Sequence, residues 1–409
     1  MIMANVYDVL KERGFVEQVS DEQSLRTALS RPITCYIGYD PSATSFHAGN
    51  LLTIMVLAHM QRHGHRPITL VGGGTGMVGD PSGKTEMRQL LTPEKIQANL
   101  EAQKKQFSRY IDYSDGKALM VNNADWLLPL NYITFLRDIG RHFSVNRMLA
   151  AEAYRLRMEA GLSFLEFNYQ VLQAYDYLHL YRQYGCVLQM GGNDQWGNIL
   201  AGVELIRRVE GGEAFALTFP LLTTSSGAKM GKTAEGAVWL DAELLSPYGF
   251  YQYWINTEDA DVERFLKIYT FLPLKKIGEL CQAKGADIRA AKEALAFEVT
   301  RLTHGEAQAE QAREASRSLF GGGAASDAVP STTIPATELS SGIPVAELFQ
   351  RVGLVQTRSE ARRLIQQGGA YVNEAQVASV DQVVSQAEVQ GGSLLLRAGK
   401  KRYHRVVIS

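Results

Sequence analysis

The chain has 409 residues, of which 45% are hydrophobic and 21% charged, a composition typical of a globular protein with two or three domains. Its formal net charge of -1 excludes a strong overall basic excess, although an average can hide a local one. Three scattered cysteines, Cys35, Cys186 and Cys281, exclude a disulfide framework and lack metal-site spacing, and no segment resembles a signal peptide or a membrane span. We therefore expect a cytoplasmic protein with no membrane contact and no protein-held metal.

The first half of the sequence predicts an α/β domain with a Rossmann-like, doubly wound parallel sheet. Residues 33–39 and 68–71 have strand character, and 51–60 between them carries apolar residues at helical spacing, which favours a right-handed βαβ unit. A second unit is expected from a helix at 172–184 through a strand at 186–190. Such a sheet binds ligands at the carboxyl ends of its strands. We expect three polar segments to meet there: 39–45, 72–84 and 191–198.

Three regions are expected after this catalytic domain, which we place at 1–245. Helical patterns dominate 246–320, which predicts an α-helical domain. Three glycines and a Ser/Thr/Pro/Ala-rich stretch predict a flexible linker over 321–342. Residues 343–409 predict a small α+β domain with nine basic and five acidic residues. The positive charge is therefore concentrated in a detachable module.

Two glycine-rich motifs after the second strand suggest nucleotide chemistry, but both are defective. Residues 74–79 fit G-x-G-x-x-G, yet Asp80-Pro81-Ser82 follows where a dinucleotide site needs a helix. Residues 79–85 resemble a P-loop with one residue too few between its glycines, and a phosphate cradle depends on the orientation of successive backbone N–H groups. A dehydrogenase or a P-loop NTPase is the alternative that these motifs leave open.

A more specific signal comes from two segments far apart in the sequence. His47-Ala48-Gly49-Asn50 opens the first predicted helix, where the helix end favours negative charge and Gly49 lets a nucleotide approach the backbone. Lys229-Met230-Gly231-Lys232-Thr233 places two cations in a Ser/Gly-rich loop, spaced to flank a polyphosphate. Each segment alone is equally well a helix cap or a solvated turn. Together, flanking a doubly wound sheet, they resemble the two signatures of the class I aminoacyl-tRNA synthetases.

Within that class, nearly the whole chain is similar to the bacterial tyrosyl-tRNA synthetases. The resemblance is carried by YIGYDPS at 36–42, HAGN at 47–50, GDPSGK at 79–84, Tyr169 with Gln173, Tyr175-Asp176, GGNDQWGN at 191–198 and KMGKT at 229–233. It implies activation of tyrosine by ATP with Mg2+, release of pyrophosphate, and transfer of tyrosine to the terminal ribose of tRNA(Tyr). Two positions depart from the family pattern: Asn50 replaces the second histidine of HIGH, and Ile37 replaces a polar residue near the ribose.

The resemblance also implies roles for individual residues. Tyr36 and Asp176 are expected to pair with the substrate hydroxyl, because an analogue without it leaves buried groups unpaired. The implied tyrosine-binding residues are Tyr36, Asp40, Asp80, Tyr169, Gln173, Asp176 and Gln195. The implied ATP-binding residues are Gly38, Ser42, His47, Gly49, Asn50, Gly192, Asp194, Lys229 and Lys232. The residues expected to stabilise charge on the leaving pyrophosphate are Ser42, His47, Lys84, Arg88, Lys229, Lys232 and Thr233. Asn50, expected near the adenosine with Gly49, is also assigned to the catalytic residues.

The C-terminal module resembles the small ribosomal-protein-type RNA-binding domain of bacterial relatives. Thr357–Glu360 has capping-box form before an apolar-striped helix. The residues expected to bind tRNA phosphates are Arg358, Arg362, Arg363, Lys400 and Lys401, although a solvated cationic face explains them as well. A catalytically silent RNA-binding relative is therefore a third alternative. The family is homodimeric, which implies Phe164 at an interface, with a core aromatic as the other interpretation.

Overall fold

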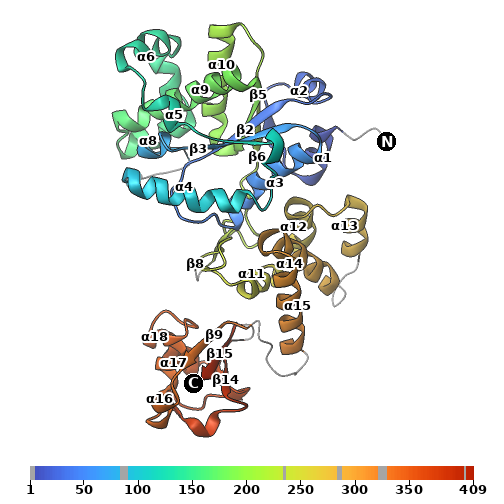
Figure 1. The fold of residues 1–409 in the computed structure, drawn as a ribbon, viewed down its shortest axis with the longest axis vertical. Helices are drawn as coiled ribbons and strands as arrows, with labels where there is room; N and C mark the ends of the chain where they lie inside the picture. The colour runs from blue at the N-terminus through green and yellow to red at the C-terminus, as the bar shows by residue number, and fades with distance from the viewer. Residues whose placement is uncertain (1–4, 83–90, 234–235, 283–287, 321–328, 400–401) are drawn as a thin grey trace. The chain divides into compact units, whose positions relative to one another are not determined.

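The computed structural model describes residues 5–82, 91–233, 236–282, 288–320, 329–399 and 402–409 (Figure 1). The chain divides into two compact units. One comprises 1–241 and 258–291, and the other comprises 242–257 and 292–409. None of the helices in the described ranges is long and apolar enough to cross a membrane.

The first unit is built on a six-stranded sheet with the strand order β1-β6-β5-β2-β3-β4. Its strands are β1 (Gln18–Val19), β2 (Thr34–Tyr39), β3 (Arg66–Val71), β4 (Leu119–Asn122), β5 (Cys186–Gly192) and β6 (Phe215–Phe219). All neighbours are parallel except the short β1, which is antiparallel to β6. The predicted doubly wound α/β class is therefore confirmed. From β2 the chain adds β3 and β4 on one side of the sheet, and then β5 and β6 on the other side. The order of the strands therefore reverses between β2 and β5, and such sheets bind ligands at this point.

The described part of the first unit contains helices between and after these strands. Helices of eight or more residues are α1 (Val6–Arg13), α3 (Ala48–Arg62), α4 (Pro93–Phe107), α8 (Glu152–Ala160), α9 (Phe164–Tyr184), α10 (Trp196–Glu210), α12 (Val262–Tyr269) and α13 (Leu274–Cys281). Shorter ones are α2 (Glu22–Ala28), α5 (Ala124–Leu127), α6 (Tyr132–Asp138) and α7 (Val145–Leu149). Helix α3 packs on β3, while α9 and α10 pack on each other and on β5.

Capping explains where α9 begins and ends. Ser163 and Glu166 form a capping box at its start, which satisfies two backbone N–H groups. Glu166 also pairs with Arg157 at 3.0 Å, and both side chains are 3% exposed. Gly185, in the left-handed conformation with φ 60°, ends the helix. This 21-residue helix is therefore fixed at both ends, and its middle carries three of the predicted site residues.

The predicted boundary at residue 245 does not coincide with the boundary of the first unit. Arg13, at the end of α1, donates to the backbone carbonyls of Lys267, Thr270 and Leu272 at 2.8, 2.9 and 2.7 Å. This buried guanidinium attaches the end of α12 to the N-terminal helix. Because the contact spans more than 250 residues of sequence, helical periodicity gave no sign of it.

The second unit contains helices and a small mixed domain. Its helices include α11 (Pro247–Ile255), most of α14 (Ile288–His304) and α15 (Glu306–Phe320). The C-terminal part has a five-stranded sheet with the order β12-β11-β14-β15-β9. These strands are β9 (Ser331–Ile334), β11 (Ala370–Val372), β12 (Ala375–Gln376), β14 (Ser393–Ala398) and β15 (Arg402–Ile408). A second pair joins β10 (Ile343–Pro344) to β13 (Val383–Val384), beside α16 (Ala336–Ser340), α17 (Val345–Arg351) and α18 (Arg358–Gln366).

The predicted flexible linker over 321–342 is wrong in its second half. Residues 331–334 form β9, which pairs in parallel with β15 from Arg405 to Ile408. Ile334 is fully buried and belongs to the core of the C-terminal domain. The sequence Ser-Thr-Thr-Ile contains three β-branched residues, which favour a strand, so the folded domain begins before residue 343. Residues 321–328 lie outside the described part of the chain.

Candidate functional site

A pocket of about 490 Å³ opens at the carboxyl ends of β2, β3 and β5. The three polar segments predicted to meet at this edge of the sheet all contribute to it. Of the predicted tyrosine-binding and ATP-binding residues, those that line it are Tyr36, Gly38, Asp40, Ser42, His47, Asn50, Asp80, Tyr169, Gln173, Asp176, Gly192, Asp194 and Gln195. Gly49 and Lys229 are not among the lining residues. Lys84 and Arg88 lie outside the described residues, as do the side chains of Lys232 and Thr233.

One end of the pocket holds a buried carboxylate and a buried hydroxyl. Asp176, on α9, is 1% exposed and accepts hydrogen bonds from Trp126 Nε1 at 2.7 Å and Asn123 Nδ2 at 2.9 Å. Burial raises the pKa of Asp176 to about 7, although these two hydrogen bonds act against the shift. The Tyr36 hydroxyl, on β2, is buried and has no hydrogen-bond partner within the described part of the chain. This pair is suited to a ligand hydroxyl, which can donate to one group and accept from the other.

Two further carboxylates line the same pocket. Asp40 accepts from Thr75 Oγ1 at 2.8 Å and from the Tyr169 hydroxyl at 2.9 Å. Asp80 accepts from Gln195 Nε2 at 2.6 Å. Burial, and then the nearby charge of Asp40, raise the pKa of Asp80 to about 6. A cation placed between these groups would stabilise their ionised forms.

Asn198, near the start of α10, orients the amides of this region. It is 4% exposed, and its Nδ2 donates to Ser82 Oγ at 3.1 Å, Gln173 Oε1 at 3.1 Å and Gln195 Oε1 at 3.3 Å. Because Asn198 bonds the amide oxygens of Gln173 and Gln195, the amide nitrogens of these two side chains point away from Asn198. The Gln195 nitrogen donates to Asp80. One buried amide therefore sets the orientation of two predicted site residues.

The HAGN segment forms the first turn of α3. His47 is the N-cap: its Nδ1 accepts from the Gly49 backbone N–H at 3.0 Å, and Asn50 Oδ1 accepts from the His47 N–H at 3.1 Å. Because Nδ1 accepts, the ring proton of neutral His47 is on Nε2, where it serves as a donor. Asn50 therefore supports the cap with the oxygen of its amide, a contact that a histidine ring does not make in the same way.

The KMGKT segment contacts this helix start through its backbone. A Cβ added to Gly49 would lie 2.6 Å from the carbonyl oxygen of Met230, so any side chain at Gly49 would collide with the loop. Gly231 has φ 81°, and its position faces the Gly49 backbone. The structure therefore brings together the two segments that the sequence identified as a pair, and glycine is required on both sides of the contact.

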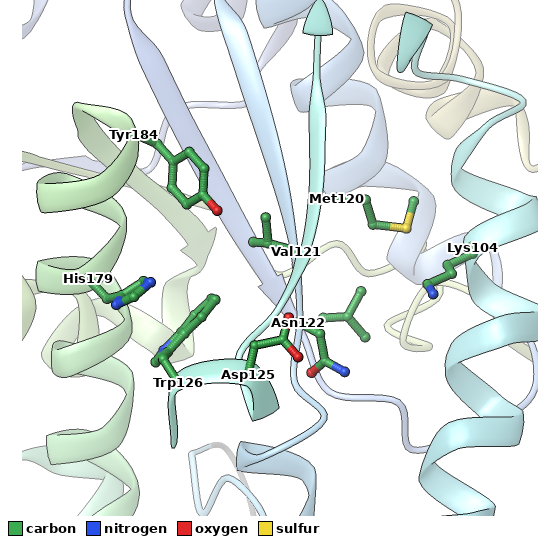
Figure 2. A pocket seen from close by; sticks show the side chains of 9 residues that line it. Lys104, Met120, Val121, Asn122, Asp125, Trp126, His179 and Tyr184 are labelled. Carbon is green, nitrogen blue, oxygen red and sulfur yellow. The ribbon is translucent and has the colours of Figure 1, made fainter. Parts of the chain in front are cut away.

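A second pocket of about 450 Å³ is lined by Trp126, whose indole N–H donates to Asp176 of the first pocket (Figure 2). Figure 2 shows side chains from α4, β4, α5 and α9 around it, namely Lys104, Met120, Val121, Asn122, Asp125, Trp126, His179 and Tyr184. The Trp126 ring stacks on His179 with centroids 4.2 Å apart. The Asn122 amide oxygen already accepts from the Gly73 and Ala124 N–H groups. We place the chemistry in the first pocket, where buried carboxylates with raised pKa values converge.

Sequence reasoning missed several residues of the site. These are Thr75, Asn123, Trp126, Gln189, Asn198 and Trp239, which line the pocket or bond to residues that do. Asn122-Asn123 directly follows the strand β4, and a polar pair after an apolar strand was the signal that marked the other segments. Trp126 has no such signal, because its contact with Asp176 joins residues 50 positions apart.

The predicted RNA-binding arginines lie on one exposed side of α18. Ala361 and Ile365 are buried in the core of the C-terminal domain, so Arg358, Arg362 and Arg363 face outward. Arg358 pairs with Glu347 at 2.9 Å. Lys400 and Lys401 lie outside the described residues.

Comparisons with known proteins agree with this architecture. Residues 28–321 match the family model described as tRNA synthetases class I (W and Y), and 324–406 match that of the tyrosine–tRNA ligase SYY-like C-terminal domain. The chain is 57% identical to the tyrosine–tRNA ligase of Desulfosudis oleivorans over 99% of both chains. It is 55% identical to that of Syntrophus aciditrophicus over 98% of this chain and 99% of the relative.

Solved structures show the same similarity. A C-terminally truncated mitochondrial tyrosyl-tRNA synthetase from Aspergillus nidulans superposes with a TM-score of 0.71 at 31% identity, covering 78% of this chain and 95% of that one. A structure from Archaeoglobus fulgidus, with a TM-score of 0.56 and 17% identity over 75% of this chain and 99% of that one, shows a shared fold.

Proposed function

The chain belongs to the class I tyrosyl-tRNA synthetases, and on that premise we propose which of its residues perform each step. A tyrosine–tRNA ligase activates tyrosine with ATP to tyrosyl-adenylate, releasing pyrophosphate, and then transfers tyrosine to the terminal ribose of tRNA(Tyr). The single observation that carries the assignment is the buried pair of Asp176 and Tyr36 at one end of the pocket.

This pair recognises the hydroxyl of the substrate by hydrogen bonding. The phenolic O–H donates to the Asp176 carboxylate, and its oxygen accepts from the Tyr36 hydroxyl. Phenylalanine would leave both groups buried and unpaired, which penalises its binding. Asn123 and Trp126 hold the carboxylate in place through hydrogen bonds of 2.9 and 2.7 Å.

Two further carboxylates that line the pocket bind the substrate ammonium. Asp80 and Asp40, with Tyr169 and Gln173, provide the oxygens for this cation. The ammonium favours the ionised form of Asp80, whose pKa burial raises to about 6 in the free protein. Gln195, which donates to Asp80 in the free protein, is near the substrate carboxylate.

Activation is an attack of the tyrosine carboxylate on the α-phosphorus of ATP, in which an oxygen–phosphorus bond forms and the bond to pyrophosphate breaks. The carboxylate is already nucleophilic, so the protein positions the reactants and stabilises the charge that grows on the leaving group. The donors that we assign to this charge are Ser42, His47, Asn50, Lys84, Arg88, Lys229, Lys232 and Thr233. Gly38 and Gly49 lie near the adenosine, and Gly192 and Asp194 near the ribose. Mg2+ enters with the phosphates of ATP.

The C-terminal domain binds tRNA through phosphate contacts. Arg358, Arg362 and Arg363 present three cations on the exposed side of α18, within a module that is basic overall. Such contacts give affinity without reading bases, and they weaken with added salt. We assign the binding of tRNA phosphates to Lys400 and Lys401 as well, and we assign the helices of 246–320 to the anticodon side of the tRNA. We place the enzyme in the cytoplasm, where its tRNA substrate is used.

We also propose that the enzyme is a homodimer. Helices α5 to α9 lie together at one side of the first unit (Figure 1). They and their connections carry exposed large apolar side chains, namely Leu128, Tyr132, Ile133, Leu136, Val145, Met158, Phe164 and Leu165. Phe164 is 71% exposed and Ile133 is 70% exposed. Apolar surface of this kind marks an interface, and aromatic residues are enriched in interface cores.

Exchange of labelled pyrophosphate into ATP, driven by amino acid without tRNA, tests the assignment. We expect exchange with tyrosine and none with phenylalanine or tryptophan at equal concentration. Exchange driven by tryptophan would contradict the roles of Tyr36 and Asp176. No exchange with any of the three would refute the activation chemistry, while binding of tRNA alone would then favour a catalytically silent RNA-binding protein.

A further inference from the structure

A row of buried amides on α4 has no part in the chemistry described so far. Asn99, Gln103 and Gln106 lie at i, i+4 and i+7, which places them on one face of the helix. Their exposed fractions are 0%, 2% and 3%. Burying amides is costly unless they are hydrogen-bonded. The partners of this row therefore show what it supports.

All three amides bond to the main chain of one segment, residues 41–46. Asn99 Nδ2 donates to the Pro41 carbonyl at 2.8 Å, and Gln103 Nε2 donates to the Ala43 carbonyl at 2.8 Å. Gln106 Oε1 accepts from the Phe46 N–H at 3.0 Å. The helix thus holds the beginning, the middle and the end of the segment.

An aromatic cluster fixes the same segment at both ends. Phe107, the last residue of α4, is fully buried. Its ring centroid lies 4.8 Å from that of Tyr39, which precedes the segment, and 4.8 Å from that of Phe46, which ends it. The contact with Tyr39 is edge-on and that with Phe46 is tilted, and such aromatic pairs add to the free energy of packing.

The segment itself forms a wall of the pocket. Its residues Ser42, Ala43, Ser45 and Phe46 line the cavity, and it leads directly into His47 at the start of α3. It belongs to no helix or strand. Its position therefore depends on contacts from outside, and α4 supplies them.

Asp40, just before the segment, is held differently. It accepts hydrogen bonds from Thr75 and from Tyr169, both on other elements. Loss of the α4 contacts would leave this anchor intact. The tyrosine side of the pocket and the nucleotide side are therefore separately supported.

We propose that Asn99, Gln103 and Gln106 are positioning residues that hold Ser42 and His47 in the geometry required for the ATP step. The proposal rests on the function proposed for the pocket. It assigns to α4 a role in formation of the adenylate that is separable from the binding of tyrosine.

Single substitutions that keep side-chain volume test the proposal. Asn99→Leu removes one hydrogen bond to the segment, and Gln106→Met removes two, because Gln106 Oε1 also accepts from Ser45 Oγ at 3.3 Å. Gln97→Met is the matched control, because Gln97 lies on the exposed side of the same helix and bonds only to Glu101 among the contacts described. Equilibrium dialysis of tyrosine without ATP measures the affinity for tyrosine alone. Single-turnover formation of tyrosyl-adenylate at varied ATP concentrations measures the ATP step.

We expect the two variants to bind tyrosine as the wild type does and to form adenylate about 10- to 100-fold more slowly, a loss that a displacement of about 1 Å can cause. The Gln97→Met control should match the wild type in both measurements. Equal losses of tyrosine affinity and of rate would overturn the proposal, as would no loss of either, or failure of both variants to fold. A wild type that forms no adenylate would instead refute the proposed function itself.

Discussion

Replacing Tyr36 by phenylalanine removes one hydroxyl group, and we expect this to affect the binding of tyrosine alone. The Tyr36 hydroxyl is buried and has no partner within the described residues, so its removal leaves no protein group unpaired there. Only the complex with tyrosine loses a hydrogen bond. A net hydrogen bond contributes about 0.5–1.5 kcal/mol, which corresponds to a loss of about 2- to 13-fold in kcat/KM for tyrosine. Activity with phenylalanine should not fall, because phenylalanine makes no bond to this hydroxyl.

Pyrophosphate exchange measured with tyrosine, and with phenylalanine at concentrations high enough to give a measurable rate, gives the ratio of the two kcat/KM values. Tyr7→Phe is the control, because Tyr7 is buried in α1 and does not line the pocket. We expect the ratio to fall for Tyr36→Phe and to stay constant for Tyr7→Phe, with no loss of thermal stability in the Tyr36 variant. An unchanged ratio, or equal losses with both amino acids, would refute the claim that Tyr36 reads the hydroxyl.

The pocket and the surfaces lead to four further predictions. Because burial raises the pKa of Asp176 to about 7, tyrosine affinity should fall by up to about tenfold per pH unit below this value, as the carboxyl takes up a proton. Calorimetric titration at several pH values measures this, and a flat profile down to about pH 5.5 would contradict it. In the free protein this raised pKa has the opposite effect: the folded state binds the proton more tightly, so stability should rise as the pH falls from about 7 toward 4, relative to Asp176→Asn. Arg362→Ala and Arg363→Ala should each weaken tRNA binding and reduce the slope of its salt dependence by about one, without changing pyrophosphate exchange. Phe164→Asp should shift the protein toward monomers in sedimentation equilibrium, and an unchanged mass would remove Phe164 from the interface.

The central sheet was predictable because its strands and helices follow one another closely in the sequence. Apolar runs bounded by turn residues located β2, β3 and β5, and the glycine and polar segments after them located the pocket. Parallel strands bring their carboxyl ends to one edge, so local patterns were sufficient to predict which segments would meet.

Contacts between distant residues were not predictable in this way. The hydrogen bonds from Asn123 and Trp126 to Asp176, and from Arg13 to the end of α12, join parts of the chain that no local pattern connects. In the sequence, the amides of α4 cannot be distinguished from the ordinary polar face of a helix. Their burial against residues 41–46 is a property of the packed structure.

The start of the C-terminal domain was misplaced for a different reason. Glycines and small polar residues between 321 and 342 outweighed the short β-branched run at 331–334 in the interpretation of the sequence. That run is an edge strand whose partner, β15, lies about 70 residues further along the chain. A strand of four residues has too little periodicity to be recognised without its partner.

A crystal structure with a non-hydrolysable analogue of tyrosyl-adenylate would test the central claim most directly. We predict that the phenolic oxygen lies within about 3 Å of both the Asp176 carboxylate and the Tyr36 hydroxyl, with the ammonium near Asp80. A tyrosyl ring bound away from this pair, or oriented with its hydroxyl toward solvent, would contradict the account.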